Sequence, residues 1–392
     1  MARLRYITAG ESHGKGLVTI VEGMPAGVPV DEDVINLELK RRQGGYGRGG
    51  RMKIEKDVVE FTAGVRRGCT IGSPIAMQLV NRDHRIDTAP AVYRPRPGHA
   101  DLAGSLKWLR ADCRETLERA SARETAARTM AGALARSVLS AFNIDVVGYV
   151  VEMLDVTARP VDGHSVAEIR TMRDANEAYC CDADAAEKMI AVIRQAKKDK
   201  DTVGGIVEVR VEGVPPGLGS CMQWTDKLDG RLMRAVASVQ AIKGVEIGLG
   251  FDVARRLGSD VHDELEFDHS KQDAPDLGYV RRTNRAGGIE GGMTNGAPVV
   301  LRAAMKPIST LLKGLDSVNL LTRNAERSDY ERSDVCAVPA ASVVVENVVA
   351  FEIASAFLDK FGGDSIKEVE SSFLRYRQLA RELNREADAG GI

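Results

Sequence analysis

The longest apolar stretch of the chain, residues 335–358, constrains the fold more than any other segment. It is long enough to cross a bilayer as a helix, but Glu346, Asn347 and Glu352 lie within it. Such polar groups favour a helix in a protein core over a membrane span. We therefore predict a core helix over about residues 340–361, preceded by Pro339, and a second, charged helix over about residues 365–387.

The rest of the chain alternates between groups of strand-like segments and helices. Strands are predicted over residues 4–8, 17–21, 58–63, 75–80, 143–156 and 204–214. Helices are predicted over residues 31–43, 119–142, 182–201 and from residue 226 onward. Because these elements do not repeat as βαβ units, we predict an α+β fold with antiparallel sheets and buried helices. Residues 252–283 are polar without clear periodicity, which predicts an excursion from that core.

Composition and charge narrow the class of protein. The 392 residues suffice for one large domain or two ordinary ones. A hydrophobic share of 44% is typical of soluble globular proteins, and a net charge of −2 argues against coating nucleic acid through bulk charge. The N-terminal residues lack an apolar core of signal-peptide length, so we expect a cytoplasmic protein.

The six cysteines show no spacing typical of a zinc site. Thiols stay reduced in the cytoplasm, so we expect the neighbouring Cys180 and Cys181 to be a reduced pair without a functional role. The sequence therefore predicts no metal centre.

Candidate functional residues gather in glycine-rich segments. Residues 10–16 read Gly-Glu-Ser-His-Gly-Lys-Gly and form a turn between two predicted strands, with Ser12 and His13 at its centre. Glycines let a ligand approach the backbone, and histidine exchanges protons near neutral pH. Taken alone, however, the segment is better explained as a hairpin loop with a solvated histidine.

Basic residues dominate two further segments. Residues 40–53 carry six basic side chains and no acidic one. They form either a solvated basic loop or a mobile clamp for an anion, because guanidinium groups pair with phosphate and carboxylate. Residues 94–101 combine two X-Pro steps with two arginines, His99 and Asp101. Such a stiff and polar segment suits the wall of a binding site.

Later segments add further anion-binding groups. The first turn of the helix predicted at 119–142 carries two arginines and Ser121, which favours a phosphate site, although a helix with surface arginines fits equally well. Residues 284–296 hold five glycines but no G-x-G-x-x-G between a strand and a helix, which disfavours a dinucleotide-binding fold. The whole inventory suits a doubly anionic substrate, proton transfers and a cofactor that supplies the electronic chemistry.

Taken in order, these motifs resemble those of the chorismate synthase family. They are GESHGKG at 10–16, RRQGGYGRGGR at 41–51, RPGHAD at 96–101, RASARETA at 119–126, QAIKGVEIG at 240–248, NRAGGIEGGMTNG at 284–296, KPIST at 306–310 and RSDVCAVPAA at 332–341. The resemblance runs from Ala9 to at least Ala354 and so covers nearly the whole chain.

The resemblance implies a lyase of aromatic amino acid biosynthesis. The reaction is the anti-1,4-elimination of phosphate from 5-enolpyruvylshikimate 3-phosphate to give chorismate, with reduced FMN required and no net redox change. The implied fold is a helical core layer sandwiched between two antiparallel β-sheets. It is a single large domain over residues 1–392, with long active-site loops at about 40–56, 252–285 and 305–335, in a homotetramer.

The resemblance also implies roles for individual residues. His13 resembles the acid that protonates the departing phosphate, and His99 the residue that protonates or hydrogen-bonds reduced flavin. Asp334 resembles the carboxylate that manages the flavin N5 proton, with Ser12 as a helper. The positions that grip the substrate's anionic groups are Arg42, Arg48, Arg51, Arg96, Arg123 and Arg332. The flavin-contacting positions are Arg119, Ala120, Ser121, Gln240, Ala241, Gly291, Lys306, Pro307, Ile308, Ser309, Thr310 and Arg332.

The possibilities that remain differ mainly in how the flavin is reduced. Arg42 and Arg48 match positions for a nicotinamide nucleotide, and some family members reduce their own flavin with NADPH. Because the chain shows no added reductase domain, we expect reduced FMN from an external flavin reductase. A flavin oxidoreductase with net redox turnover is one alternative. A nucleic-acid-binding module using residues 40–53 is another, which the slightly acidic net charge and the lone aromatic Tyr46 disfavour.

Overall fold

Two antiparallel sheets form the frame of the molecule, and the computed structural model describes residues 4–50, 54–329, 331 and 333–383. One sheet has the strand order β1 (Arg5–Ala9), β2 (Gly16–Glu22), β6 (Ile75–Val80) and β3 (Glu60–Ala63). The other has the order β10 (Ile242–Ile247), β15 (Val299–Met305), β9 (Gly205–Glu212), β7 (Asp145–Met153) and β8 (Val156–Thr157). The predicted α+β fold with antiparallel sheets is confirmed.

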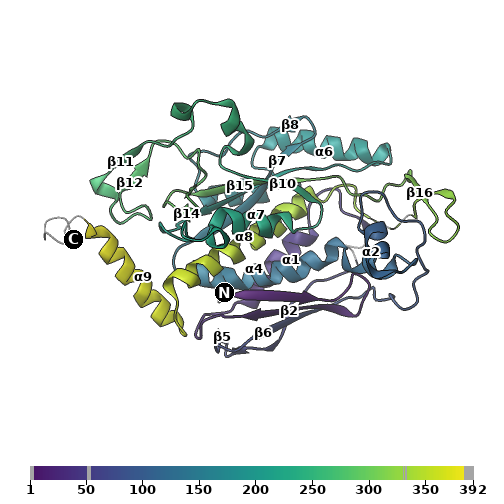
Figure 1. Ribbon diagram of the computed structural model, residues 1–392, viewed down its shortest axis with the longest axis horizontal. Coiled ribbons are helices and arrows are strands. Elements are labelled where there is room, and N and C mark those ends of the chain that lie inside the picture. The colour runs from purple at the N-terminus through teal and green to yellow at the C-terminus, as the bar shows by residue number, and fades with distance from the viewer. Residues whose placement is uncertain (1–3, 51–53, 330, 332, 384–392) are drawn as a thin grey trace.

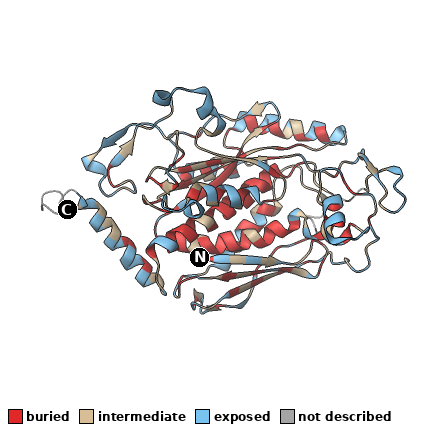
Figure 2. Cartoon of the chain, viewed as in Figure 1, coloured by how far each residue is buried: buried red, intermediate tan, exposed pale blue. Residues whose placement is uncertain are grey.

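Helices lie between these two sheets (Figure 1). Helix α4 (Thr125–Ser140) contacts β1, β2 and β6, whereas α8 (Val338–Phe361) contacts β7, β9 and β15. The two helices contact each other, and α1 (Glu32–Gln43) and α7 (Leu228–Ala237) also pack on α8. Figure 2 shows that buried residues concentrate on these helices and on the strands that face them.

Small residues bring these layers together. A Cβ atom on Gly132 of α4 would lie 2.1 Å from the backbone oxygen of Asn347 in α8. A Cβ atom on Gly148 of β7 would lie 2.5 Å from the backbone oxygen of Ser342 on the same helix. Because no side chain fits in either place, glycine is what allows α8 to pack closely against both α4 and β7.

The apolar stretch forms the predicted core helix. Helix α8 is long and apolar enough to cross a membrane, but 94% of its most apolar window is buried inside the protein. Its buried Glu346 pairs with Arg41 of α1 at 2.9 Å, with Arg136 of α4 at 2.6 Å and with Arg173 at 3.2 Å. The polar residues within the stretch therefore bind neighbouring helices, as a core position requires.

Capping residues account for three of the predicted helix starts. Asp31, Asp182 and Ser365 accept hydrogen bonds from the first-turn amides of α1, α6 (Ala183–Lys198) and α9 (Ile366–Arg381). Pro339 lies inside the first turn of α8 rather than before it. This position suits proline, because the first amides of a helix have no partner within the helix.

The prediction of a single helix over residues 119–142 is wrong at its N-terminal end. The structure has α3 (Arg114–Arg119), a short 3₁₀ turn (Ala122–Glu124) and then α4. Ser121 accepts a hydrogen bond from the Arg123 amide and so caps the 3₁₀ turn. The Glu124 carboxylate, three residues after Ser121, accepts hydrogen bonds from Thr8 and Arg128.

The remaining elements are short. They comprise α2 (Asp101–Trp108), α5 (Val166–Asp174) and the two-stranded pairs β4 (Val65–Arg66) with β5 (Cys69–Thr70), β11 (Leu265–Phe267) with β12 (Tyr279–Arg281), β13 (Ile289–Glu290) with β14 (Met293–Thr294), and β16 (Asp316–Val318) with β17 (Ala325–Arg327). The β11–β12 hairpin and several 3₁₀ turns make up the polar excursion predicted at 252–283. Arg377 of α9 donates a hydrogen bond to the Asp273 carbonyl and so ties the excursion to α9.

Candidate active site

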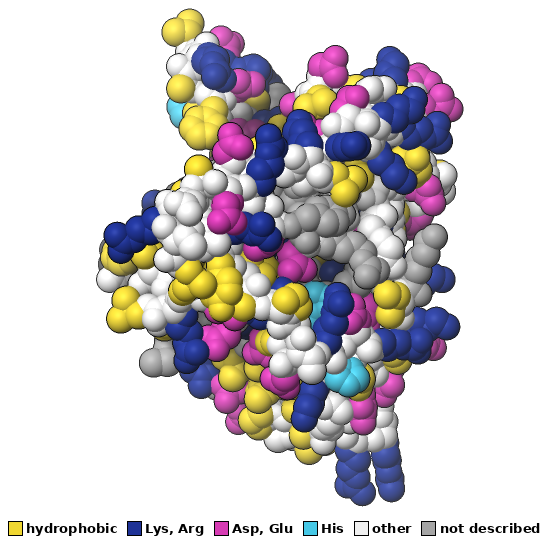
Figure 3. Space-filling view, turned by 90° about the vertical axis from the view of Figure 1, so that its right-hand side faces the viewer, with side chains coloured by type: hydrophobic (Ala, Val, Ile, Leu, Met, Phe, Trp, Pro, Cys, Tyr) yellow, Lys and Arg dark blue, Asp and Glu magenta, His cyan; other side chains and the backbone are white. Residues whose placement is uncertain are grey.

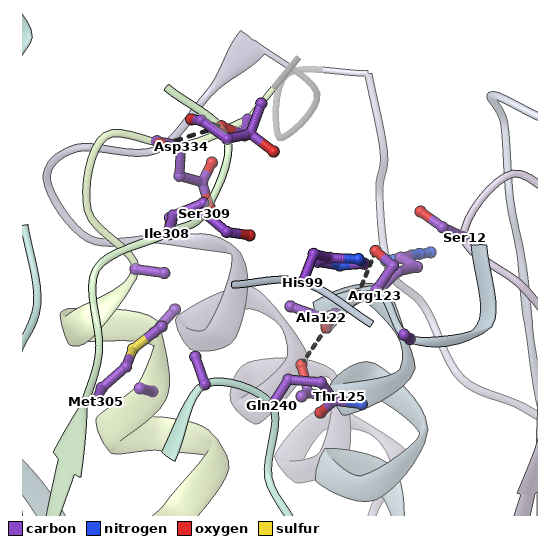
Figure 4. Close-up of a pocket in the computed structure, with 18 of the residues that line it drawn as sticks. Ser12, His99, Ala122, Arg123, Thr125, Gln240, Met305, Ile308, Ser309 and Asp334 are labelled. Atoms are coloured by element: carbon purple, nitrogen blue, oxygen red, sulfur yellow. Dashed lines mark hydrogen bonds between the residues drawn. The ribbon is translucent and has the colours of Figure 1, made fainter. Parts of the chain in front are cut away.

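A cavity of about 530 Å³ opens where the first turns of α8 meet the loop of residues 10–16 and the junction between α3 and α4. Figure 4 shows side chains from these elements and from the ends of β10 and β15 around it. Among the described residues that line it, five are cationic and two are carboxylates: Arg42, Arg48, Arg96, Arg123 and Lys306 against Glu331 and Asp334. On the face at the right-hand end of Figure 1, histidine side chains lie near the middle among interspersed basic and acidic side chains (Figure 3).

His13 is held against a buried carboxylate. Its backbone N–H donates to Glu118 Oε2 at 2.9 Å, and its ring Nδ1 lies 2.8 Å from the same oxygen. Arg114 contacts the other oxygen of Glu118 at 3.2 Å. Burial favours the neutral acid, but hydrogen bonds from His13 and Arg114 hold the pKa of Glu118 below its ordinary value. An ionised carboxylate only accepts, so Nδ1 of His13 carries a proton and Nε2 is the nitrogen left for a ligand.

His99 repeats this arrangement on another segment. Its Nδ1 contacts the buried Asp101 carboxylate, which Arg96 also holds through Nε at 2.8 Å. Burial opposes ionisation, but hydrogen bonds from His99 and Arg96 hold the pKa of Asp101 well below its ordinary value. Arg96 Nη2, which only donates, also lies 3.0 Å from Nδ1, so the tautomer of His99 follows from whichever of Arg96 and Asp101 its Nδ1 pairs with. Two oriented histidines face one cavity, an arrangement that suits proton transfer to or from a bound molecule.

Two arginines share one buried carboxylate at the cavity wall. Arg42 donates to Asp57 at 3.0 Å, and Arg123 contacts both oxygens of Asp57 at 2.7 and 2.8 Å. Arg123 Nη2 also lies 4.0 Å from the buried Glu55 carboxylate, so two guanidiniums face two carboxylates here. Burial lowers the pKa of Arg42 to about 10. Both arginines line the cavity, and guanidinium groups pair with phosphate and carboxylate.

The glycine-rich basic loop also reaches the cavity. Arg48 pairs with Asp334 at 2.6 Å, and the Gly49 amide donates to the other Asp334 oxygen at 2.5 Å. Arg96 donates to Thr310 at 3.0 Å, which fixes the segment after β15. Residues far apart in the sequence therefore meet here through their side chains, and the predicted clamp lies beside the predicted carboxylate.

One wall of the cavity is apolar and built from small residues. It includes Ala120, Ala122, Val239, Ala241, Met305, Ile308, Ala340, Ala341 and Val344. Ala241 has a φ of 69°, which is uncommon for alanine, and its carbonyl accepts a hydrogen bond from the Lys306 amide at 2.9 Å. A lining that combines apolar and cationic residues fits a planar ring that carries a phosphate tail, so these residues fit FMN.

The structure brings most of the predicted residues to this cavity. Those lining it are Ser12, His13, Arg42, Arg48, Arg96, His99, Ala120, Ser121, Arg123, Gln240, Ala241, Lys306, Pro307, Ile308, Ser309, Thr310 and Asp334. Arg119 does not line it and instead donates to the backbone carbonyls of Thr8 and Gly10. Gly291 lies in the turn between β13 and β14, away from the lining residues. Arg51 and Arg332 fall outside the residues that the structure describes.

Three carboxylates behind the site escaped the sequence reasoning: Asp57, Glu118 and Glu124. Several of their partners are far away in the sequence, with His13 and Glu118 separated by 105 positions. Among the described residues, the local signals are the i,i+4 spacings of Arg114 with Glu118 and of Glu124 with Arg128. That spacing predicts an ion pair and says nothing about the histidine.

Comparison with known proteins identifies the family. The profile of the chorismate synthase family matches residues 4–358. Chorismate synthase of Geobacter metallireducens is 53% identical over 97% of this chain and 100% of its own length. The enzyme of Desulforamulus reducens is 51% identical over the same shares. A crystal structure of chorismate synthase superposes with a TM-score of 0.79 at 40% identity, covering 97% of this chain and 98% of that one.

The resemblance seen in the motifs is therefore confirmed over the length of the fold. The cavity with its two oriented histidines lies in the matched part of the chain. The chain belongs to the chorismate synthase family, and its activity is that family's lyase reaction in the biosynthesis of chorismate and hence of aromatic amino acids.

Proposed function

We propose that the cavity binds 5-enolpyruvylshikimate 3-phosphate beside reduced FMN and eliminates phosphate and a ring hydrogen in anti fashion. The observation that carries this proposal is the pairing of two carboxylate-oriented histidines with a surplus of cations in one cavity. A substrate with two carboxylates and a phosphate needs both the histidines and the cations. The cations hold its anionic groups, and a histidine supplies the proton that phosphate takes as it leaves.

The substrate's anionic groups are held by guanidiniums. Arg42 and Arg123 line the cavity, which supports their binding of one anionic group. Arg48 and Arg96 line the same cavity, and Arg51 and Arg332 complete the set that the family resemblance implies. Nδ1 of His13 is fixed on Glu118, and Nε2 lies 3.7 Å from Asp83. As an imidazolium between these carboxylates, His13 donates the Nε2 proton to the departing phosphate and is left neutral with its remaining proton on Nδ1.

Reduced FMN, when bound, supplies electron density that helps phosphate leave and that is recovered as the ring hydrogen departs. Its ring would lie against the apolar wall, held by Ala120, Ser121, Gln240, Ala241 and residues 306–310. His99 would hydrogen-bond the flavin ring. Asp334, helped by Ser12, would exchange the proton at the flavin N5. We include Arg119 and Gly291 among the flavin positions on the family resemblance alone.

We also propose where the protein acts, how its chains assemble and what supplies its electrons. The protein acts in the cytoplasm as a homotetramer, each chain being one domain in which two sheets sandwich the helical layer. The contacts of α4 with one sheet and of α8 with the other support that sandwich. NADPH, if it is used, binds at Arg42 and Arg48, whereas an external flavin reductase is the electron source that we favour.

Anaerobic incubation of the substrate with photoreduced FMN tests the proposal. Chorismate and free phosphate should form in equal amounts, without flavin oxidation in proportion to product. The absence of product would refute the proposal, and NADPH consumption stoichiometric with product would favour an oxidoreductase. Sustained turnover with oxidised FMN and NADPH alone would show that no external reductase is needed.

A further inference from the structure

Asn81 lies directly after β6 and joins two parts of the cavity wall from behind. Its side chain is fully buried and does not line the cavity. Its Oδ1 accepts a hydrogen bond from Arg123 Nε at 2.9 Å. Its Nδ2 donates to the loop of residues 10–16, where the accepting carbonyls, at 3.1, 3.2 and 2.8 Å, are those of Glu11, Ser12 and Gly14. One amide therefore holds both an arginine of the cavity and the loop that carries His13.

The chemistry of these partners fixes which way the amide of Asn81 points. A guanidinium only donates and a backbone carbonyl only accepts, so the oxygen must face Arg123 and the NH₂ group must face the loop. An ionised aspartate would offer the loop carbonyls no donor, and an alanine would serve neither partner. Asparagine therefore supplies, at one place, the acceptor and the donor that the arginine and the loop require.

Other contacts of the same groups make this arrangement rigid. Arg123 Nη1 contacts both oxygens of Asp57 at 2.7 and 2.8 Å, so the guanidinium is held by Asn81 at Nε and by Asp57 at Nη1. The backbone N–H of Asn81 donates to the Lys15 carbonyl at 3.0 Å, which ties the loop of residues 10–16 to the end of β6. The loop and the guanidinium are thus fixed relative to each other through Asn81.

This relative position matters for the proposed reaction. His13 and Arg123 both line the cavity, and Ser12, next to His13 in the chain, lies at the same end of it as Arg123 (Figure 4). A substrate held by guanidiniums loses its phosphate efficiently only if the proton donor reaches the leaving oxygen. Because a misplacement of about 1 Å can cost about a hundredfold in rate, the spacing of these two groups must be set precisely.

We infer that Asn81 is a positioning residue for the elimination, which sets the place of His13 relative to the guanidinium of Arg123. This inference rests on the roles proposed above for His13 and Arg123, and it adds the side chain that fixes their spacing. Asn81 does not line the cavity, so it acts through these two groups and not by contact with a ligand.

A double-mutant cycle tests the inference, with kcat measured anaerobically on the substrate with photoreduced FMN. Asn81→Asp keeps the size of the side chain and the acceptor for Arg123, but it withdraws the donors from the loop. It should lower kcat by about tenfold to a hundredfold, because three carbonyl oxygens are repelled by the new carboxylate and His13 is displaced. In the His13→Ala background, the same substitution should lower kcat by no more than about threefold, because the group through which it acts is gone. A merely structural role would lower kcat by the same factor in both backgrounds.

Asn284 supplies a matched control away from the cavity lining. Its side chain also donates to a loop carbonyl, that of Pro298 at 2.8 Å, and accepts from a loop amide, that of Gly288 at 2.8 Å. Asn284→Asp should leave kcat unchanged. If Asn81→Asp does not fold, as judged by circular dichroism, the cycle is run with Asn81→Ala, in which water can occupy the vacated space, and that cycle decides.

Two outcomes contradict the inference and can be told apart from failure of the proposed function. A near-normal kcat for Asn81→Asp, or an equal loss in the two backgrounds, would refute the positioning role while His13 keeps its own role. A near-normal kcat for His13→Ala would refute the proposed proton donor itself and the inference with it.

Discussion

The carboxylate of Glu118 holds His13 twice, through the backbone N–H at 2.9 Å and through ring Nδ1 at 2.8 Å. Glu118 does not itself line the cavity. It therefore fixes the position and the tautomer of His13 without touching a ligand. The Glu118 side chain is fully buried, so water does not substitute for it.

Glu118→Gln should lower kcat by about tenfold to a hundredfold, because the ring of His13 loses a partner that only accepts and becomes misplaced. KM for the substrate should change little, since Glu118 makes no ligand contact. Steady-state kinetics with photoreduced FMN measure both constants. Glu115→Gln is a matched control on the same helix, where Glu115 forms an exposed pair with Arg110. Equal rates for Glu118→Gln and this control would contradict the positioning role.

His13→Ala and His99→Ala should each lower kcat by about 10²- to 10⁴-fold, the usual contribution of a positioned acid or base. Both side chains are partly exposed at the cavity, so the substitutions should leave the fold intact. The rate of phosphate release measures the effect, and circular dichroism checks the fold. Near-normal rates in both variants would show that the proton-transfer roles are wrong.

Glu346 should make the stability of the protein depend on pH in the acid range. Burial opposes its ionisation, but Arg41, Arg136 and Arg173 hold the pKa of Glu346 well below its ordinary value. Since the unfolded chain takes up the proton first, the stabilising contribution is complete above about pH 5 and is lost as the pH falls further.

Urea unfolding of Glu346→Gln at several pH values measures this contribution. The variant should be less stable at pH 7 by about 3–5 kcal/mol, because three guanidiniums lose their shared partner. Its stability should also fall less steeply than that of the unsubstituted protein between about pH 5 and pH 3. Glu187→Gln, at an exposed position on α6, is the control and should change neither quantity. An unchanged slope for Glu346→Gln would contradict the prediction.

Gly132→Ala should destabilise the protein by about 1–3 kcal/mol, because the new Cβ would lie 2.1 Å from the Asn347 oxygen and push α4 away from α8. Gly230→Ala makes the same change in α7, where a Cβ would meet no atom within 4 Å. It should raise stability by up to about 1 kcal/mol through helix propensity. Thermal unfolding compares the two, and equal shifts would contradict the packing explanation.

Local physical chemistry made much of the fold predictable. The apolar run at 335–358 predicted the core helix, since such a stretch must be buried. The helices predicted from about residues 31, 182 and 365 begin next to Asp31, Asp182 and Ser365, and each of these side chains caps amides only a few residues away. The ordered motifs revealed the family, and the profile and the relatives confirm it.

What the sequence alone did not determine is the choice of partners across the fold. Ser121 lies at the start of the helix predicted over 119–142 but caps a short 3₁₀ turn, and the nearby Glu124 binds Thr8 and Gln240, each 116 positions away. His13 looked like a solvated loop residue until the fold brought Glu118 to it across 105 positions. Side-chain partners are selected by which groups packing leaves buried and unsatisfied. Only the tertiary structure decides that, and so only the structure turned a list of histidines and arginines into one oriented site.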